Sequence, residues 1–484
     1  MPRPAAAAAH VVVDDAASLH AALKSDARLG AYLPGRSWGA SAVVWAGLPI
    51  TAAEHVDLAG QIRGAIAIRP EGLGYAVAFP LQNQGALLAV VTAGQSARFR
   101  RRSVDGADHL VPAQGEDGKQ RALLRGYLVV AGSTADLAEL GPFLVQARVE
   151  AAAPADPERA AAPMATVALD RSAALRGLEA LRDRTKRTLP WDSLGLRLPI
   201  TWSETTAIRL DADAGVLSLT ASLGTVEKGA APATGRPSRL LDLPSTTEIG
   251  LALFLDQASR SEAAAAGADA LARGPLGPGA ARPIGAALAQ IAEARGDSLL
   301  LGYERGTTGP LLSGSADIRD AERAKEGLAA LVAALQDESL EAGLRAHGLA
   351  LKAEETVLER VGEVVRARLR KDDEIVSSVL ARLHRGELTF CSGADSAEGL
   401  RRLLTEDSPR LRAVPSLGRL ASLVGQEAIA AAVLDAAAPF TTGPPAGQAR
   451  SPAFVLGTVE RRGDDLLGRI VAEPRALAEL VDDR

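Results

Sequence analysis

Short aliphatic runs bounded by Gly, Pro and Asn recur along the chain, and such runs are typical of buried strands. This pattern predicts strands at 41–45, 74–79, 86–92 and 126–131. Apolar residues at helical spacing predict helices at Ala135–Leu144 and Asp320–Leu335. Because consecutive strands joined by short turns favour antiparallel pairing, the pattern predicts an α+β fold, a largely antiparallel sheet with helices packed against it.

The segment 361–370 fits two kinds of element. Val365, Ala367 and Leu369 alternate with arginines, as in a strand with one buried face. The apolar residues from Val361 to Leu369 also follow a helical spacing. A similar arginine-rich segment, Arg98–Arg102, precedes an Asp-Gly turn in the first half of the chain and favours the strand.

Five local patterns occur twice, in the same order along the chain. The separations, by subtraction, are about 210, 224 to 228, 260, 265 and 248 residues. The pairs begin at Leu33 and Leu243, Gly74 and Gly302, Arg125 and Arg385, Val167 and Ala432, and around Gly215 and Gly463. The order predicts a tandem duplication whose copies differ by inserted loops. The expected organisation is a tether or disordered N-terminus at 1–10, a first α+β repeat at 11–235 and a second repeat with insertions at 236–484.

The chain shows no transmembrane pattern. The longest uncharged stretch, Gly72–Ala97, is long enough to span a bilayer. Its centre, Pro80–Gly85, is rich in turn-forming residues, so the stretch predicts two short strands. The start, Met1–Ala9, lacks the apolar core of a signal peptide. Ala/Gly/Pro-rich linkers are expected at 150–163, 229–237, 273–283 and 437–452.

Composition narrows the function classes. Of the 484 residues, 47% are apolar, which is enough to fill sizeable cores and excludes a disordered chain. The formal charge of −5 argues against a nucleic-acid binder, which usually carries a basic footprint. A single cysteine excludes an internal disulfide and any site that needs several cysteines.

Cys391 is the one candidate thiol nucleophile, with His384 seven residues before it. Its flanks do not match a nucleophile elbow. In the repeat it aligns with Ala131, a small buried strand residue, and free cysteines are usually buried, so packing is the favoured interpretation.

Metal and phosphate sites are also not indicated. The six histidines form no zinc-binding pair at local spacing; they are His10, His20, His55, His109, His347 and His384. Asp211–Gly215 lacks the ligands of a calcium loop and predicts a hairpin turn. The glycines at 115–118 and 274–279 fit neither a P-loop nor a dinucleotide fingerprint. No catalytic, cofactor-binding or metal-binding residue is therefore assigned, and no cofactor is expected.

Two arginine-rich segments, Arg98–Arg102 and Arg366–Lys371, are the dense basic patches. They favour solvated strand faces or a guarded sheet edge over a binding site for acidic partners. Four tryptophans are expected to anchor cores; they are Trp38, Trp45, Trp191 and Trp202.

The order of a Leu-Pro pair, a strand hairpin, the segment Gly126–Ala138 and a late hairpin resembles a group of uncharacterised bacterial envelope proteins. That resemblance implies a periplasmic or envelope-anchored location and no known activity; a cytoplasmic location is the alternative. Three functions remain open: a non-enzymatic binding or scaffold protein with an unknown protein partner, a carrier of an apolar ligand in a cleft between the two halves, and a hydrolase that uses Cys391 or a distant serine with His384.

Overall fold

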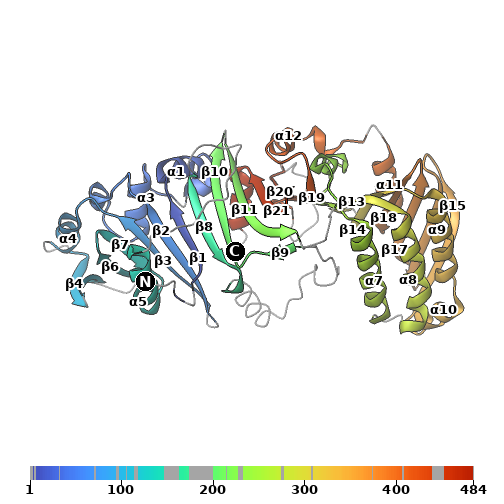
Figure 1. The fold of residues 1–484 in the computed structure, drawn as a ribbon, viewed down its shortest axis with the longest axis horizontal. Coiled ribbons are helices and arrows are strands. Elements are labelled where there is room, and N and C mark those ends of the chain that lie inside the picture. The colour runs from blue at the N-terminus through green and yellow to red at the C-terminus, as the bar shows by residue number, and fades with distance from the viewer. Residues whose placement is uncertain are drawn as a thin grey trace.

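The computed structural model describes residues 4, 7–31, 33–69, 72–93, 97–104, 106–113, 118–146, 163–173, 200–213, 215–226, 233–273, 277–306, 309–372, 374–405, 408–438 and 452–482. Within these ranges, 21 strands form one antiparallel sheet with helices on both faces. The predicted α+β class is confirmed. Figure 1 shows the sheet running along the long axis of the molecule.

The first half of the chain contributes eleven of these strands: β1 (Ala7–Val13), β2 (Ile62–Arg69), β3 (Gly72–Pro80), β4 (Phe99–Val104), β5 (Ala107–Pro112), β6 (Gln120–Leu124), β7 (Tyr127–Ala131), β8 (Ala165–Asp170), β9 (Ile200–Trp202), β10 (Thr205–Asp213) and β11 (Val216–Val226). The second half contributes β12 (Ile249–Phe254), β13 (Arg295–Arg305), β14 (Pro310–Ile318), β15 (Leu349–Leu358), β16 (Gly362–Lys371), β17 (Glu374–His384), β18 (Glu387–Gly393), β19 (Ala428–Asp435), β20 (Phe454–Arg462) and β21 (Asp465–Ala472).

The strands of the two halves follow the same spatial order. In the first half the order is β4-β5-β6-β7-β3-β2-β1-β8-β10-β11, with β9 beside the end of β11. In the second half it is β15-β16-β17-β18-β14-β13-β12-β19-β20-β21. The two sets join where β11 pairs antiparallel with β21, from Leu217 opposite Ala472 to Thr225 opposite Asp465.

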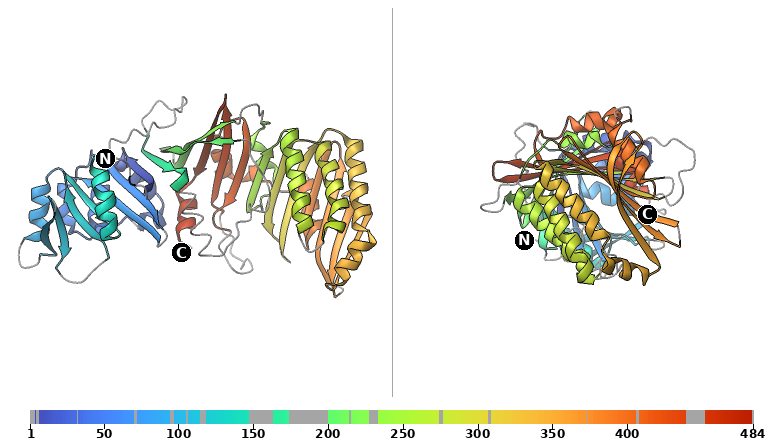
Figure 2. Two further views of the ribbon diagram at one scale, coloured as in Figure 1. Left: turned by 60° about the horizontal axis from the view of Figure 1, so that its bottom comes forward. Right: turned by 90° about the vertical axis from the view of Figure 1, so that its right-hand side faces the viewer.

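Helices cover each end of the sheet. They are α1 (Ala16–Lys24), α2 (Ala27–Ala31), α3 (Trp38–Trp45), η1 (Ile50–His55), α4 (Gln84–Thr92), α5 (Thr134–Gln146), η3 (Pro237–Asp242), α7 (Gln257–Arg273), α8 (Gly277–Ala294), α9 (Ala321–Leu335), α10 (Glu338–Arg345), α11 (Ser396–Leu404), η4 (Leu411–Ala413), α12 (Pro415–Ala421) and α13 (Pro474–Asp482). Residues from α1, α3, η1 and α4 pack on one face of the first half, and residues from α8, α9 and α10 pack on the same face of the second. Figure 2 shows the helix layer of the second half lying against one side of its strands.

The opposite face has its own cover. α5 packs on it in the first half and α11 in the second. Near the centre, η3, η4 and α12 cover β12, β19 and β20 there. We call this the back face, and the face under α1 and α8 the groove face.

Two runs predicted as strands are helices. The run 41–45 lies in α3 and the run 86–92 in α4, because periodicity cannot distinguish a short apolar strand from a buried helix. The missed signals are the N-caps: the Ser37 side chain accepts a hydrogen bond from the Ala40 amide, and the Asn83 side chain accepts one from Ala86. The stretch Gly72–Ala97 therefore holds a strand and a helix instead of two strands.

The remaining predicted elements match in most cases. Strands 74–79 and 126–131 and helices Ala135–Leu144 and Asp320–Leu335 are confirmed as β3, β7, α5 and α9. The segment 361–370 is strand β16. A tether or disordered N-terminus was predicted at 1–10. This is wrong for residues 7–10, because Ala7–His10 form the buried start of β1. The linker predicted at 273–283 is wrong for residues 277–283, because α8 begins at Gly277. Taken together, the other three predicted linkers lie mostly outside the described residues.

Candidate functional site

An apolar groove lies at the centre of the groove face, where the two halves meet. Its volume is about 370 Å³. The first half lines it from β10 and β11, through Ile208, Leu219, Ala221 and Leu223. The second half lines it from β12, β19, β20 and β21, with side chains that include Leu251, Val459 and Ile470. Ile470 is 44% exposed, so the groove opens to solvent.

Small residues produce the hollow. The strand register places Leu219, Ile470, Gly457 and Ala432 side by side across four strands. Gly457 and Ala432 leave space that larger residues on neighbouring strands surround. A Cβ atom added at Gly457 would meet its nearest neighbour at 3.9 Å, so this part of the floor is open. The groove is therefore part of the side-chain pattern of the sheet.

The back face of the same strands is polar and buried. Arg209, Thr220, Arg469 and Thr458 form a row across β10, β11, β21 and β20, and each is at most 5% exposed. Arg209 Nε contacts a carboxylate oxygen of Asp211 at 2.7 Å on its own strand. Buried charges need such partners, and this partner lies on the same strand as the arginine.

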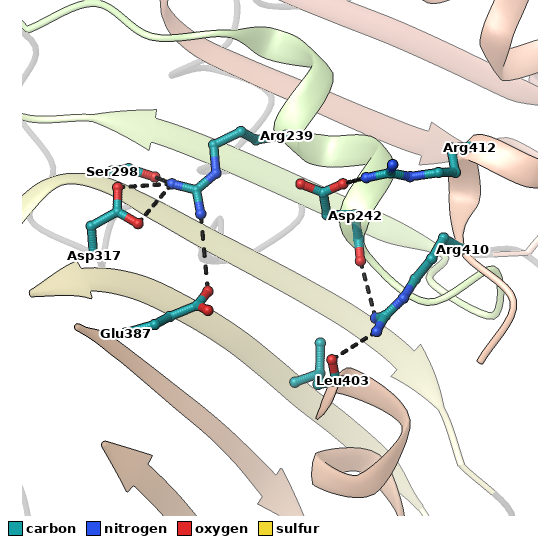
Figure 3. Close-up of polar contacts among 8 residues, drawn as sticks. All are labelled: Arg239, Asp242, Ser298, Asp317, Glu387, Leu403, Arg410 and Arg412. Carbon is teal, nitrogen blue, oxygen red and sulfur yellow. Dashed lines mark hydrogen bonds and ion pairs between the residues drawn. The ribbon is translucent and has the colours of Figure 1, made fainter. Parts of the chain in front are cut away.

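Arginines also hold the cover of the back face in place (Figure 3). Arg239 of η3 bridges to Asp317 of β14 at 2.8 Å and approaches Glu387 of β18 at 3.9 Å. Arg410 donates to the backbone carbonyls of Asp242 at 3.1 Å, Leu403 at 2.8 Å and Thr405 at 3.0 Å. Burial lowers the pKa of the Arg410 guanidinium. Arg412 forms an ion pair with Asp242. These contacts are structural, since each arginine is used to join η3 or the 403–412 segment to a neighbour.

Cys391 is unsuited to nucleophilic catalysis. It lies in β18 with no exposed surface, and burial raises the pKa of its thiol to about 12. The thiolate is the nucleophilic form, so a thiol with this pKa is inert at neutral pH. His384 lies at the exposed end of the neighbouring strand β17. The burial of Cys391 supports the packing interpretation, and the hydrolase hypothesis stays a prediction.

The other candidates are placed as follows. In the described part of the chain, no three His, Cys, Asp or Glu side chains gather at metal-binding distance. The predicted hairpin at 211–215 is confirmed, with Gly215 at a φ of 79°. Arg100–Arg102 lie exposed on the edge strand β4, and Arg366 and Arg368 pair with Glu354 at 2.5 and 2.8 Å. Trp38 is buried in a core, and Trp191 lies outside the described residues.

Sequence reasoning expected a cleft between the halves without naming any residue of it. The groove residues come from six strands far apart in the chain, and all except Thr458 and Arg469 are Gly, Ala, Leu, Ile or Val. Only the register brings them together. The signal available was the small residue in an apolar strand, such as Gly457 within Phe454–Arg462, where a missing side chain indicates a close approach or a hollow.

Among the described helices, none is both long enough and apolar enough to cross a bilayer. No family model matches the chain, and no curated protein matches it. Solved structures similar to it include crystal form I of TP0453, with a TM-score of 0.26 and 10% identity over 46% of this chain and 77% of that one. Crystal form IV of TP0453 has a TM-score of 0.26 and 11% identity over 45% of this chain and 76% of that one. At these scores the similarity to TP0453 supports no conclusion about function.

Proposed function

We propose that the chain is a non-enzymatic binding protein whose ligand is an apolar chain held in the central groove. The groove itself is the observation that supports this function. It is open to solvent and lined on the groove face by hydrocarbon side chains from both halves. Exposed apolar hollows of this kind are typical of ligand sites.

The volume sets the size of the ligand. A methylene group takes roughly the space of one water in the liquid, about 30 Å³, so 370 Å³ holds about 12 such groups. Burying each methylene contributes about 0.8 kcal/mol, which is about fourfold in affinity. Affinity for n-alkyl acids is therefore expected to rise with chain length to about dodecanoate and then level off.

A substitution in the floor of the central groove tests the proposed ligand site. Gly457→Phe places a ring in the groove, and the open space around this residue predicts a folded protein. The full chain, stripped of bound lipid, is titrated with dansyl-undecanoic acid, and dodecanoate is used to displace the probe. We expect Gly457→Phe to weaken binding more than tenfold.

The matched control is Val357→Phe. Val357 lies on the edge strand β15 and is 72% exposed, so the same ring added there is expected to leave probe binding unchanged. If Gly457→Phe binds the probe as the wild type does, or if the wild type does not bind it, the proposed function is wrong. Native mass spectrometry of the protein as purified identifies any lipid that it carries.

A location in the bacterial envelope is part of the same proposal. It is supported by the sequence resemblance to envelope proteins. Fractionation of cells that express the natural gene, with detection of the protein in periplasmic, membrane and cytoplasmic fractions, tests it. Recovery in the cytoplasmic fraction would contradict it.

A further inference from the structure

A second cavity lies inside the first half, apart from the central groove. It has a volume of about 200 Å³ between α1, α3 and the groove face of β1, β2 and β3. Val13, Leu23, Leu33, Ile62 and Phe79 are among its apolar lining residues. Trp38 and Trp45 add aromatic walls.

Two polar side chains interrupt this lining. His20 and Ser41 face the cavity and are 9% and 4% exposed. His20 Nε2 lies 3.1 Å from Ser41 Oγ, and Ser41 Oγ also accepts a hydrogen bond from the Gly35 amide at 3.1 Å. Among the described residues, His20 Nδ1 has no hydrogen-bond partner. This nitrogen is not among the buried side-chain atoms that lack a partner, so it is accessible to solvent or to a ligand in the cavity.

The hydrogen bonds allow this nitrogen to act as a donor. Since the Gly35 amide donates to Ser41 Oγ, the hydroxyl is free to donate to His20 Nε2. In the tautomer in which Ser41 donates to Nε2, Nδ1 carries the proton and can donate to a ligand in the cavity. Lys24 follows His20 by one helical turn on α1, but its ammonium donates to the Gly35 carbonyl and Lys24 does not line the cavity. A carboxylate is an acceptor that fits the Nδ1 donor.

We propose that this cavity binds a medium-chain carboxylic acid, with His20 Nδ1 donating to the carboxylate and the alkyl chain lying between Trp38 and the sheet. At about 30 Å³ for each methylene-sized group, the cavity holds about seven, which corresponds to octanoate. This site is separate from the central groove and does not depend on it.

Bromine on a bound chain quenches nearby tryptophans, so omega-bromo-octanoate reports occupancy directly. The full-length protein is titrated with this acid in the Gly457→Phe background, which fills the groove. Because Trp38 and Trp45 line the cavity, saturable quenching is expected there. The same quenching is expected in the wild type, so failure of the groove proposal does not affect this test.

Three variants test the geometry. His20→Leu removes the donor and keeps an apolar wall, so octanoate affinity is expected to fall about tenfold or more while octanol affinity changes little. Ala16→Leu fills the cavity and is expected to weaken both ligands. His347→Leu, at an exposed position, is the matched control.

Absence of saturable quenching would overturn the proposal. So would quenching that His20→Leu and Ala16→Leu leave unchanged, or an equal loss of octanoate and octanol affinity in His20→Leu. If Ala16→Leu does not fold, His20→Leu and the wild-type quenching still decide the question.

Discussion

Removal of the Glu460 carboxylate tests whether the buried polar contacts hold the centre of the sheet. Glu460 is 4% exposed as a side chain and lies 3.6 Å from Arg469 Nε, whose side chain is 5% exposed. It also accepts hydrogen bonds from the Gly425 amide at 2.8 Å and the Thr458 hydroxyl at 2.9 Å. Glu460→Ala leaves a buried guanidinium without this counter-charge. Breaking a buried pair in this way typically costs 3–5 kcal/mol, so the free energy of unfolding is expected to fall by about 4 kcal/mol.

Urea unfolding followed by far-UV circular dichroism measures this loss. Glu322→Ala is the matched control, because the Glu322–Lys325 pair is exposed, and its loss is expected to change the free energy of unfolding by less than about 0.5 kcal/mol. Replacing Glu460 and Arg469 together by methionine removes both charges and is expected to recover most of the stability. A loss below about 1 kcal/mol in Glu460→Ala, or a double variant less stable than the single one, would refute this reasoning.

Three further predictions follow from local contacts. Cys391 is expected to resist thiol reagents at pH 8 in the folded protein, because its pKa is raised to about 12, and to react in urea; rapid labelling of the native state would contradict this. Hydrogen bonds from the Ser18 side chain and amide lower the pKa of Asp15, which is the N-cap of α1. The stability that the charged cap contributes is therefore complete above the ordinary pKa of aspartate, and it is lost as the pH falls through the lowered pKa of Asp15. Asp15→Ala should lower the free energy of unfolding by about 1 kcal/mol near pH 7, with a smaller difference from wild type at pH 2. Arg125 and Arg385 both have positive φ in two-residue hairpin turns, where asparagine is favoured. Arg125→Asn and Arg385→Asn should therefore each raise the melting temperature; opposite effects would show that the two turns are not equivalent.

The sequence predicted the fold class because the periodic signals were strong where elements are long. α9 shows this, since it has one clearly apolar face over several turns. The signal for β16 was ambiguous, because its apolar residues fit both a strand and a helix. The errors fall on short, uniformly apolar runs, which became α3 and α4. There the cap residue before the run, Ser37 or Asn83, carried more information than the run itself.

Three of the five repeated patterns lie at equivalent places in the two strand orders. The turns at Arg125 and Arg385 both precede the strand that pairs beside β3 or β14. Val167 and Ala432 lie in β8 and β19, the third strand from the join in each half. The turns at Gly215 and Gly463 close the last hairpin of each half. Two patterns do not fit. At 41–45, α3 is a helix and its proposed counterpart β12 is a strand. Gly74 lies in β3 and Gly302 in β13, which occupy different places in the two strand orders. We propose that a tandem duplication produced halves near 11–235 and 236–484, on the strength of the common strand order.

The central groove is a consequence of how such halves join. Taken alone, each half would end in an unpaired strand, β11 or β21, and exposed edges of this kind favour pairing with another strand. Pairing β11 with β21 satisfies both edges. The helices on the groove face pack toward the two far ends of the sheet, which leaves the strands nearest the join less covered on that face. Small residues there, Gly457 and Ala432 among them, then turn an uncovered apolar surface into a hollow of defined volume. The ligand site that we propose thus arises from the join, and neither half would contain it alone.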